Sequence, residues 1–504
     1  MAKLRIINEI HQNREYFHSI FWIFYYLCSM NNKIITSLTK QYWPYGLICI
    51  WAVACWTFFE FCYPYHFFYK EQNQLFLWTA DYLGTYSGPG WLARMAGDFL
   101  TQFYFYLFAG SVILTIVLLF LGDIIRRTFQ NFGFGKWAFL IGILAMTLEA
   151  WRHFHYGYNL SSTISLIGYA LALWLCSLVF KKRKKLSFIL MLMAMLPCWL
   201  LFGKPQAGKF IGPEWELEKL LAVDNEYNWG HYTKVKQLVE NDTNRSPYAV
   251  FLYNLAQAQK GQLPDNLLQI RPIEMGTLWK IGPEAPLLET KMINELYYVL
   301  GDVTYAERAA MMGNVFAPDN RNVRMIKRLA ECNLISGDRP AADKYLRILK
   351  NTFVYRNWAE LAPTLPVYKE KAQFINKKDT IRLGDFARTI LLELLDSNPQ
   401  NIAALDYLLC TDLTTGDIGS FKSDYDRYCM NRNAPRIKPL YQQALLIYMA
   451  GTQAPSEELF RYVTDTKQLS DFNEYNKVRG TAMTSKYHDT YWYYFDKNFQ
   501  NKKQ

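Results

Sequence analysis

Two long apolar runs in the first half of this chain are separated by five consecutive basic residues. The runs cover residues 160–180 and 186–202, and neither contains a charged side chain. The basic residues between them are Lys181, Lys182, Arg183, Lys184 and Lys185. An apolar run of about 20 residues is long enough to cross a bilayer as a helix. A short Lys- and Arg-rich loop between two spans stays in the cytoplasm. Since each span reverses the side of the membrane, this cluster determines on which side every other segment lies.

Five apolar segments before residue 203 qualify as predicted spans. They cover residues 45–61, 99–121, 137–151, 160–180 and 186–202. The third is the shortest, and charge decides whether it crosses. If it did not cross, Arg126 and Arg127 would lie on the opposite side of the membrane from the Lys181–Lys185 cluster. We therefore predict five spans, with a cytoplasmic N-terminus and every residue after 202 on the outer side.

Charge is distributed unevenly between the two halves of the chain. Up to Gly203 there are 16 Lys and Arg against 8 Asp and Glu, whereas the totals are 55 and 44. The basic excess thus lies beside apolar segments, as the positive-inside rule requires, and we expect no nucleic-acid partner. The nine cysteines form no CxxC motif, so we predict no metal site and no cofactor.

These patterns divide the chain into three predicted parts. Residues 1–42 form an N-terminal cytoplasmic or interfacial segment, residues 43–203 a membrane domain, and residues 204–504 a helical-repeat soluble domain. Residues 16–29 are apolar, but they are short and aromatic for a span. Two hypotheses remain open for residues 1–29: they are an upstream extension from a mis-assigned start, or they form an interfacial helix.

The soluble half shows apolar residues at helical spacing and glycines at intervals typical of helical hairpins. In the clearest unit, residues 293–318, Gly301 and Asp302 mark the turn between two helices, and Ala306 and Ala310 permit close packing. The unit resembles a tetratricopeptide repeat, which implies an α-solenoid with an extended binding surface. A second unit follows, with its turn at residues 337–338.

Four residues are candidates for chemistry in the membrane half: Glu71, Asp98, Glu149 and Arg152. Glu71 and Asp98 lie in the predicted first outer loop, where a carboxylate is able to act as a base toward an acceptor. Glu149 and Arg152 end the third segment, where they would approach a lipid phosphate. The alternative interpretation is that Glu71 and Asp98 are solvated loop charges, and that Glu149 and Arg152 form an ion-paired interfacial anchor.

Several longer stretches carry a resemblance to a known family. They are residues 71–77, 89–93, 98–103, 254–263 and 491–494, the last reading Tyr-Trp-Tyr-Tyr. With these stretches the chain resembles an uncharacterised family of bacterial inner-membrane proteins, domain of unknown function 6057. The resemblance covers the chain from about residue 33 onward. It implies membrane anchoring and a helical-repeat tail, and it supplies no activity and no catalytic residue.

Two functions of different classes follow from these observations. We expect an integral inner-membrane protein that displays a tetratricopeptide-like domain in the periplasm and recruits a protein partner, as a scaffold of the cell envelope. The alternative is a membrane-embedded transferase that acts on a polyprenyl-linked donor. The chain contains no Walker A, HExxH or GxSxG motif, which favours the first function.

Overall fold

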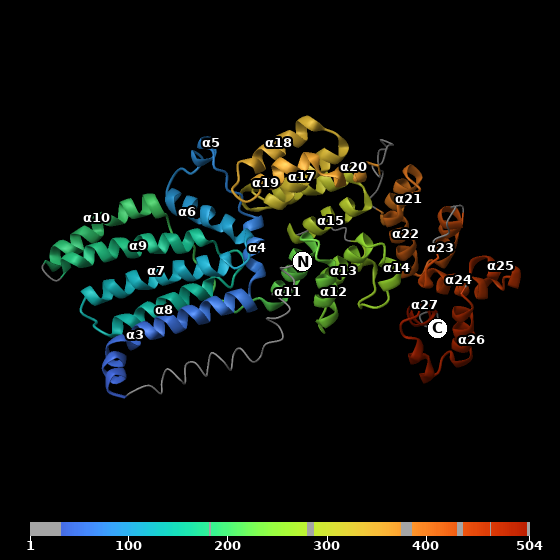
Figure 1. The fold of residues 1–504 in the computed structure, drawn as a ribbon, viewed down its shortest axis with the longest axis horizontal. Coiled ribbons are helices and arrows are strands. Elements are labelled where there is room, and N and C mark those ends of the chain that lie inside the picture. Colours follow the sequence, from blue (N-terminus) through green and yellow to red (C-terminus); the bar gives the residue numbers. More distant parts are fainter. Residues whose placement is uncertain are drawn as a thin grey trace.

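The computed structural model describes residues 32–180, 183–279, 287–373, 386–430, 437–463 and 465–500. Every regular element in these residues is a helix, which confirms the all-α fold class. Residues 1–31, on which the two hypotheses about the chain start depend, lie outside the described residues, as do Lys181 and Lys182. Figure 1 shows two groups of helices: a bundle built from residues 32–62 and 109–203, and the C-terminal helices (residues 215–500) beside one end of it.

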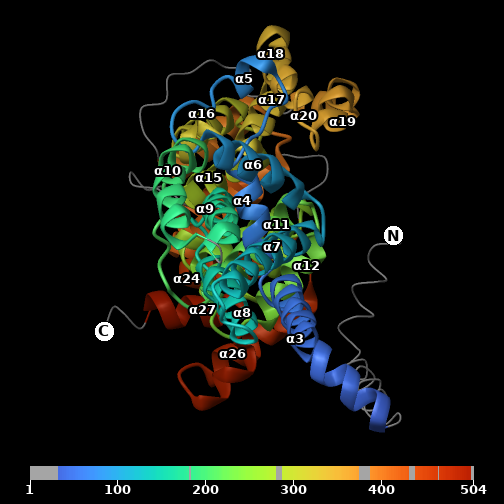
Figure 2. The same ribbon diagram turned by 90° about the vertical axis from the view of Figure 1, so that its left-hand side faces the viewer.

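The bundle consists of five long helices that run side by side (Figures 1 and 2). They are α3 (Asn32–Thr57), extended by the π-helical turn η1 (Phe58–Cys62), α7 (Ala109–Asn131), α8 (Trp137–Arg152), α9 (Leu160–Phe180) and α10 (Lys184–Phe202). Within the described residues, four helical segments are long and apolar enough to cross a membrane. They are Trp43–Cys62, Ala109–Asn131, Leu160–Val179 and Lys185–Phe202.

Helix α8 is the predicted third span, and at 16 residues it is shorter than the other four. At 1.5 Å per residue it is roughly 24 Å long, against a hydrocarbon core of about 30 Å. It nevertheless packs along α7. A Cβ on Gly142 of α8 would lie 2.8 Å from the carbonyl oxygen of Gly122 on α7. Two glycines therefore let the backbones of these helices approach closely, as small residues do between membrane helices.

The predicted bounds of the second span, residues 99–121, are wrong. Phe99 belongs to α6 (Trp91–Thr101), which continues into the 3-10 turn η2 (Gln102–Phe105). The chain then turns through Phe108, whose φ is +68°, and α7 begins at Ala109. The apolar composition runs without a break through this turn, so composition alone could not locate the start of the span.

The end of the bundle distant from the C-terminal helices carries basic residues. Arg126 and Arg127 lie on the last turns of α7, and both form ion pairs with Asp123. Arg183 is exposed between α9 and α10. Figure 1 shows the end of α7, the start of α8, the end of α9 and the start of α10 at the same end of the bundle. The two basic groups therefore share one end, as the predicted antiparallel path requires.

Three helical hairpins in the C-terminal helices have the same turn. They are α15 (Leu287–Leu300) with α16 (Val303–Val315), α17 (Val323–Ser336) with α18 (Arg339–Lys350), and α22 (Ile402–Thr415) with α23 (Ile418–Tyr425). A glycine with positive φ comes first in each turn: Gly301, Gly337 and Gly416. An aspartate follows and accepts a hydrogen bond from a backbone N–H in the first turn of the second helix: Asp302, Asp338 and Asp417. The Gly-Asp pair thus ends one helix and caps the next.

Most buried apolar residues of the C-terminal helices form one hydrophobic core, which extends from Leu220 to Tyr494 and includes Leu75. Ala310, Met325 and Leu329 form a small separate cluster. The other helices that contribute to this region are α11 (Trp215–Asn228), α12 (Tyr232–Asn241), α13 (Pro247–Gln259), α14 (Leu263–Asn266), α19 (Arg356–Leu361), α20 (Pro366–Ala372), α21 (Ala387–Ser397), α24 (Pro439–Thr452), α25 (Ser456–Tyr462), α26 (Thr466–Val478) and α27 (Tyr491–Phe495). Tyr491 and Trp492 of α27 are buried, and α27 packs on α24. The aromatic C-terminal segment therefore covers the end of the helical stack.

Candidate functional site

The segment of residues 65–78, here called the docking segment, lies between the bundle and the C-terminal helices (Figure 1). It begins with α4 (Tyr65–Gln72), which contacts α11 and α17. Six of the eight residues of α4 are buried: His66, Phe67, Phe68, Lys70, Glu71 and Gln72. The C-terminal helices cover α4, so this part of the predicted outer loop is buried.

Glu71, a candidate base under the transferase alternative, is buried in the structure. Its exposed fraction is 3%. The phenol of Tyr355, which precedes α19, donates a 2.8 Å hydrogen bond to Glu71 Oε1. Burial raises the pKa of Glu71 to about 8. Glu71 is therefore not a solvated loop charge, and it joins the docking segment to the C-terminal helices.

The two residues after Glu71 make further buried hydrogen bonds to the C-terminal helices. The Gln72 amide donates to Asn225 Oδ1 at 2.8 Å and accepts from Lys291 Nζ at 3.2 Å. The Asn322 amide donates to Asn73 Oδ1 at 2.7 Å. Burial lowers the pKa of Lys291 to about 7. Three successive side chains of the docking segment thus find their polar partners in the other half of the chain.

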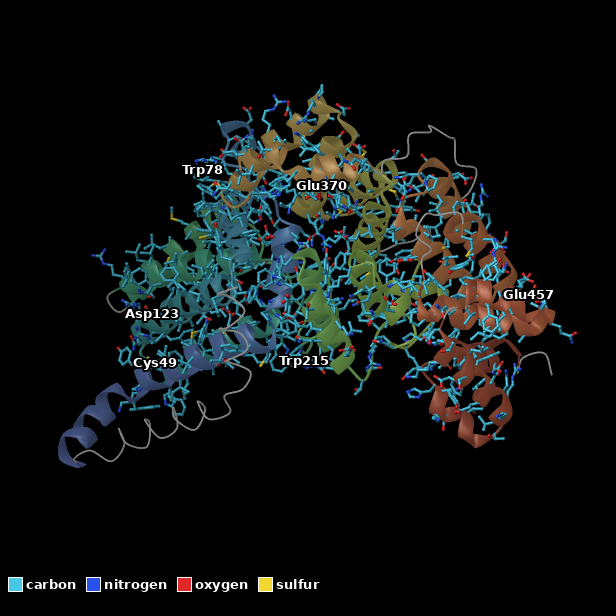
Figure 3. All side chains as sticks on the ribbon, turned by 45° about the vertical axis from the view of Figure 1, so that its right-hand side comes forward. Cys49, Trp78, Asp123, Trp215, Glu370 and Glu457 are labelled. Atoms are coloured by element: carbon cyan, nitrogen blue, oxygen red, sulfur yellow. The ribbon has the colours of Figure 1, made fainter. Side chains whose placement is uncertain are left out.

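Backbone groups of the docking segment pair with the C-terminal helices as well. The Leu75 N–H donates to the Arg321 carbonyl at 3.1 Å, and the Trp78 N–H donates to the Asn351 carbonyl at 2.9 Å. Buried backbone groups are costly to leave without partners, so these contacts define one position of the segment along the helices. Figure 3 shows Trp78 at the junction between the bundle and the C-terminal helices.

The N-terminus of α4 is held by carboxylates of α11. Glu218 accepts hydrogen bonds from the backbone N–H groups of Tyr65, at 2.5 Å, and His66, at 3.1 Å. A carboxyl at this position satisfies N–H groups that have no partner within the helix. Burial raises the pKa of Glu218 to about 8 and lowers that of nearby Lys70 to about 7. Among the described residues, Lys70 Nζ has no hydrogen-bond partner.

A row of buried charges extends from this site into the C-terminal helices. Arg324 Nη1 binds both carboxylate oxygens of Asp224, at 2.8 and 2.9 Å, and its Nη2 lies 3.2 Å from Glu295. Arg328 binds the other oxygen of Glu295 at 2.6 Å and lies 3.2 Å from Glu331. Acidic and basic groups alternate along the row, so it connects α11, α15 and α17 with each buried charge paired.

Asp98, the second predicted base, also contacts the C-terminal helices. Its Oδ2 accepts hydrogen bonds from the Tyr86 phenol at 2.7 Å and from Arg321 Nη1 at 3.1 Å. Burial raises the pKa of this carboxyl. Arg321 lies over the ring of Tyr82, with its guanidinium carbon 5.3 Å from the ring centroid. Asp98 is therefore a second contact between the bundle side and the C-terminal helices.

Glu149 and Arg152 form the predicted ion pair, at 3.2 Å. Glu149 is buried, and it also accepts hydrogen bonds of 2.7 Å each from Tyr158 and Thr163. The ring of His153 makes a 2.8 Å hydrogen bond to the same threonine hydroxyl. Glu71, Asp98 and Glu149 thus have three different sets of partners. Within the described residues no cluster of three or more His, Cys, Asp or Glu side chains is arranged to hold a metal ion.

Sequence reasoning missed the basic residues that complete the site. Lys291 and Glu295 are four residues apart on α15, and Arg324 and Arg328 are four apart on α17. Residues at this spacing lie on one face of a helix. This spacing in α15 and in α17 was the available signal for a buried layer of charges. The sequence alone could not show that the charged face of α15 packs against the charged face of α17.

The fold and this site define a class of all-helical proteins. In this class, a bundle has helices able to cross a membrane, and a buried polar segment attaches a second helical region to the bundle. Within that class, the chain belongs to the family of unknown function DUF6057, which matches residues 40–208 and 202–498. No curated protein and no solved structure matches the chain.

Proposed function

We propose that this protein is an integral protein of the bacterial inner membrane that displays a tetratricopeptide-like repeat domain on the outer side, where the domain binds a protein partner. In this role it is a scaffold of the cell envelope. The observation that carries the proposal is the docking segment. Its side chains and backbone fix the C-terminal helices at one position against the bundle.

A fixed connection of this kind suits a scaffold, because it presents a binding surface in one orientation. Surface-exposed linkers leave domains free to move, whereas a buried interface with paired polar groups favours one arrangement. The same contacts weigh against the transferase alternative. A general base must reach its substrate, and Glu71 is 3% exposed with its oxygen engaged by Tyr355.

One surface of the C-terminal helices supports protein binding. The second half of α16 and the residue that follows it expose four large apolar side chains: Met311, Met312, Val315 and Phe316. The first half of the same face carries Thr304 and Arg308. Methionine-rich apolar surfaces adapt to the side chains of a partner helix or peptide. We therefore assign the partner contact to the Met311–Phe316 surface.

The test is photo-crosslinking in cells, with a photoreactive amino acid at position 315. The matched control position is 304, on the same face of the same helix. We expect a discrete protein adduct from position 315 and none from position 304. The adduct should fall at least fivefold when Phe316→Asp is added, while the melting temperature of the purified protein stays unchanged.

Two outcomes would contradict this function. One is the absence of any protein adduct from position 315 at normal expression and membrane localisation. The other is the same set of adducts from both positions, because adducts that do not depend on the apolar half of α16 would not report a specific partner. The partner protein identified in the adduct by mass spectrometry should bind the purified wild-type protein and should not bind the Phe316→Asp variant.

A further inference from the structure

The loop between α18 and α19 exposes Phe353 at the junction with the bundle. Its exposed fraction is 47%. The ring packs on Trp78, with centroids 5.6 Å apart, and also contacts Phe99 and Phe103. Trp78 is itself 55% exposed. The hydrogen bond between Trp78 N–H and the Asn351 carbonyl keeps the two rings together. An aromatic surface is thus shared between the docking segment and the C-terminal helices.

This surface continues into the turn that precedes α7. Four consecutive residues of that turn are exposed and apolar or aromatic: Phe105, Tyr106, Leu107 and Phe108. The ring of Phe105 contacts that of Tyr355, with centroids 5.1 Å apart. The aromatic surface therefore extends from the α18–α19 loop to Phe108, the residue before α7.

The same exposed face then runs along the span itself. Phe108, Val112, Ile116 and Phe120 recur at intervals of four, and all are exposed. In a helix able to cross a membrane, such a stripe faces lipid. Aromatic residues at the end of a lipid-facing stripe occupy the headgroup level of the bilayer. Figure 1 places α5 (Ala80–Leu83), which follows the docking segment, alongside the end of the bundle.

Basic residues flank the exposed ring of Phe353 in the C-terminal helices. Lys350 and Arg356 are exposed on either side of Phe353, and Arg356 Nε donates to the Lys350 carbonyl at 3.0 Å. An aromatic side chain between two cations matches the interface of a bilayer, where the ring meets acyl chains and the cations meet phosphates.

We propose that Phe353 and its flanking cations, with Trp78 and residues 105–108, contact the lipid headgroup region, so that the C-terminal helices bind the membrane surface directly. The lipid contact is separate from the α16 surface assigned to a protein partner. It gives the C-terminal helices a second attachment, beside the docking segment.

The test uses the unmodified protein in lipid nanodiscs that contain a phospholipid with a photoreactive diazirine near the headgroup. After irradiation and trypsin digestion, Phe353 is found in the peptide of residues 351–356, between the cleavage sites at Lys350 and Arg356. The matched control is the peptide that contains Phe460, which is 61% exposed on α25, far from the bundle. We expect at least tenfold more lipid adduct on residues 351–356.

The proposal is overturned if residues 351–356 remain unlabelled while the peptide of residues 95–126, which contains the first 18 residues of α7, is labelled. Equal labelling of the Phe460 peptide would also overturn it, since that result would report random collision. A photoreactive amino acid at position 353 in cells provides a second measurement. A protein adduct there in place of a lipid adduct would assign the surface to a protein partner and reject the lipid contact.

Discussion

The phenol of Tyr355, which is partly buried, donates a hydrogen bond to the buried side chain of Glu71 across 284 positions of sequence. This one contact connects α4 with the turn before α19. Around it, Gln72 and Asn73 bind residues of α11, α15 and the turn before α17. The position of the C-terminal helices against the bundle therefore depends on buried polar groups of the docking segment.

Replacing Glu71 with Gln should change how stability depends on pH. The folded pKa of Glu71 is about 8, and the ordinary value is 4.5. The folded protein therefore keeps a proton that the unfolded chain releases between these values, and stability falls as pH rises through that window. Glu71→Gln keeps the acceptor for Tyr355 and removes the titration. We expect similar stabilities at pH 5 and, at pH 8.5, a variant more stable by on the order of 3 kcal/mol.

Thermal unfolding in detergent at several pH values measures this difference. Glu370→Gln is the matched control, because Glu370 is exposed on α20 (Figure 3) and its replacement should leave the pH profile unchanged. If Glu71→Gln and the wild-type protein showed parallel pH profiles from pH 5 to 8.5, the assignment of Glu71 as a buried carboxyl would be wrong.

Removing Arg324 should be strongly destabilising. Arg324→Ala leaves Asp224 and Glu295 buried without their shared cation. Removing one partner of a buried ion pair costs about 3–5 kcal/mol. Arg347→Ala, at an exposed position of α18, is the control and should change stability by less than about 0.5 kcal/mol. Denaturant unfolding gives both values, and a loss below about 1 kcal/mol for Arg324→Ala would argue against the buried charge row.

The Gly-Asp turn that the three hairpins share predicts how replacing its capping aspartate changes the free energy of unfolding. Asp338→Ala removes the side chain that accepts from the Ala341 N–H, and should cost about 1 kcal/mol. Asp338→Asn retains an acceptor oxygen and should cost much less. Unfolding curves of the two variants compare them directly. Equal losses would mean that the capping hydrogen bond does not stabilise this turn.

Conservative replacement of the two loop carboxylates separates a scaffold from a transferase. Glu71→Gln with Asp98→Asn keeps hydrogen-bond acceptors and removes any base. We expect the protein adduct from position 315 and the cellular phenotype of the intact gene to persist. Loss of the phenotype at normal protein level, with the adduct retained, would instead favour chemistry at these carboxylates.

The sequence predicted the bundle and the hairpins more fully than the site. Apolar runs located the helices of the bundle, although the start of α7 was misplaced by ten residues because the run continues through a turn. Gly301 and Asp302 marked their turn correctly, since positive φ and helix capping each need a particular residue type. The sequence left Glu71 as either a candidate base or a solvated loop charge, because burial depends on partners such as Tyr355, which are distant in sequence.

The central claim is that the bundle holds the C-terminal helices on the outer side of the membrane. The most direct measurement is labelling of intact cells by an impermeant maleimide, in a chain whose native cysteines are replaced. Native Cys332 is unsuited to the assay because it is fully buried. Phe460→Cys reports the C-terminal helices, and Arg183→Cys reports the opposite end of the bundle. We predict labelling at position 460 in intact cells and at position 183 only after permeabilisation; the reverse pattern would contradict the account.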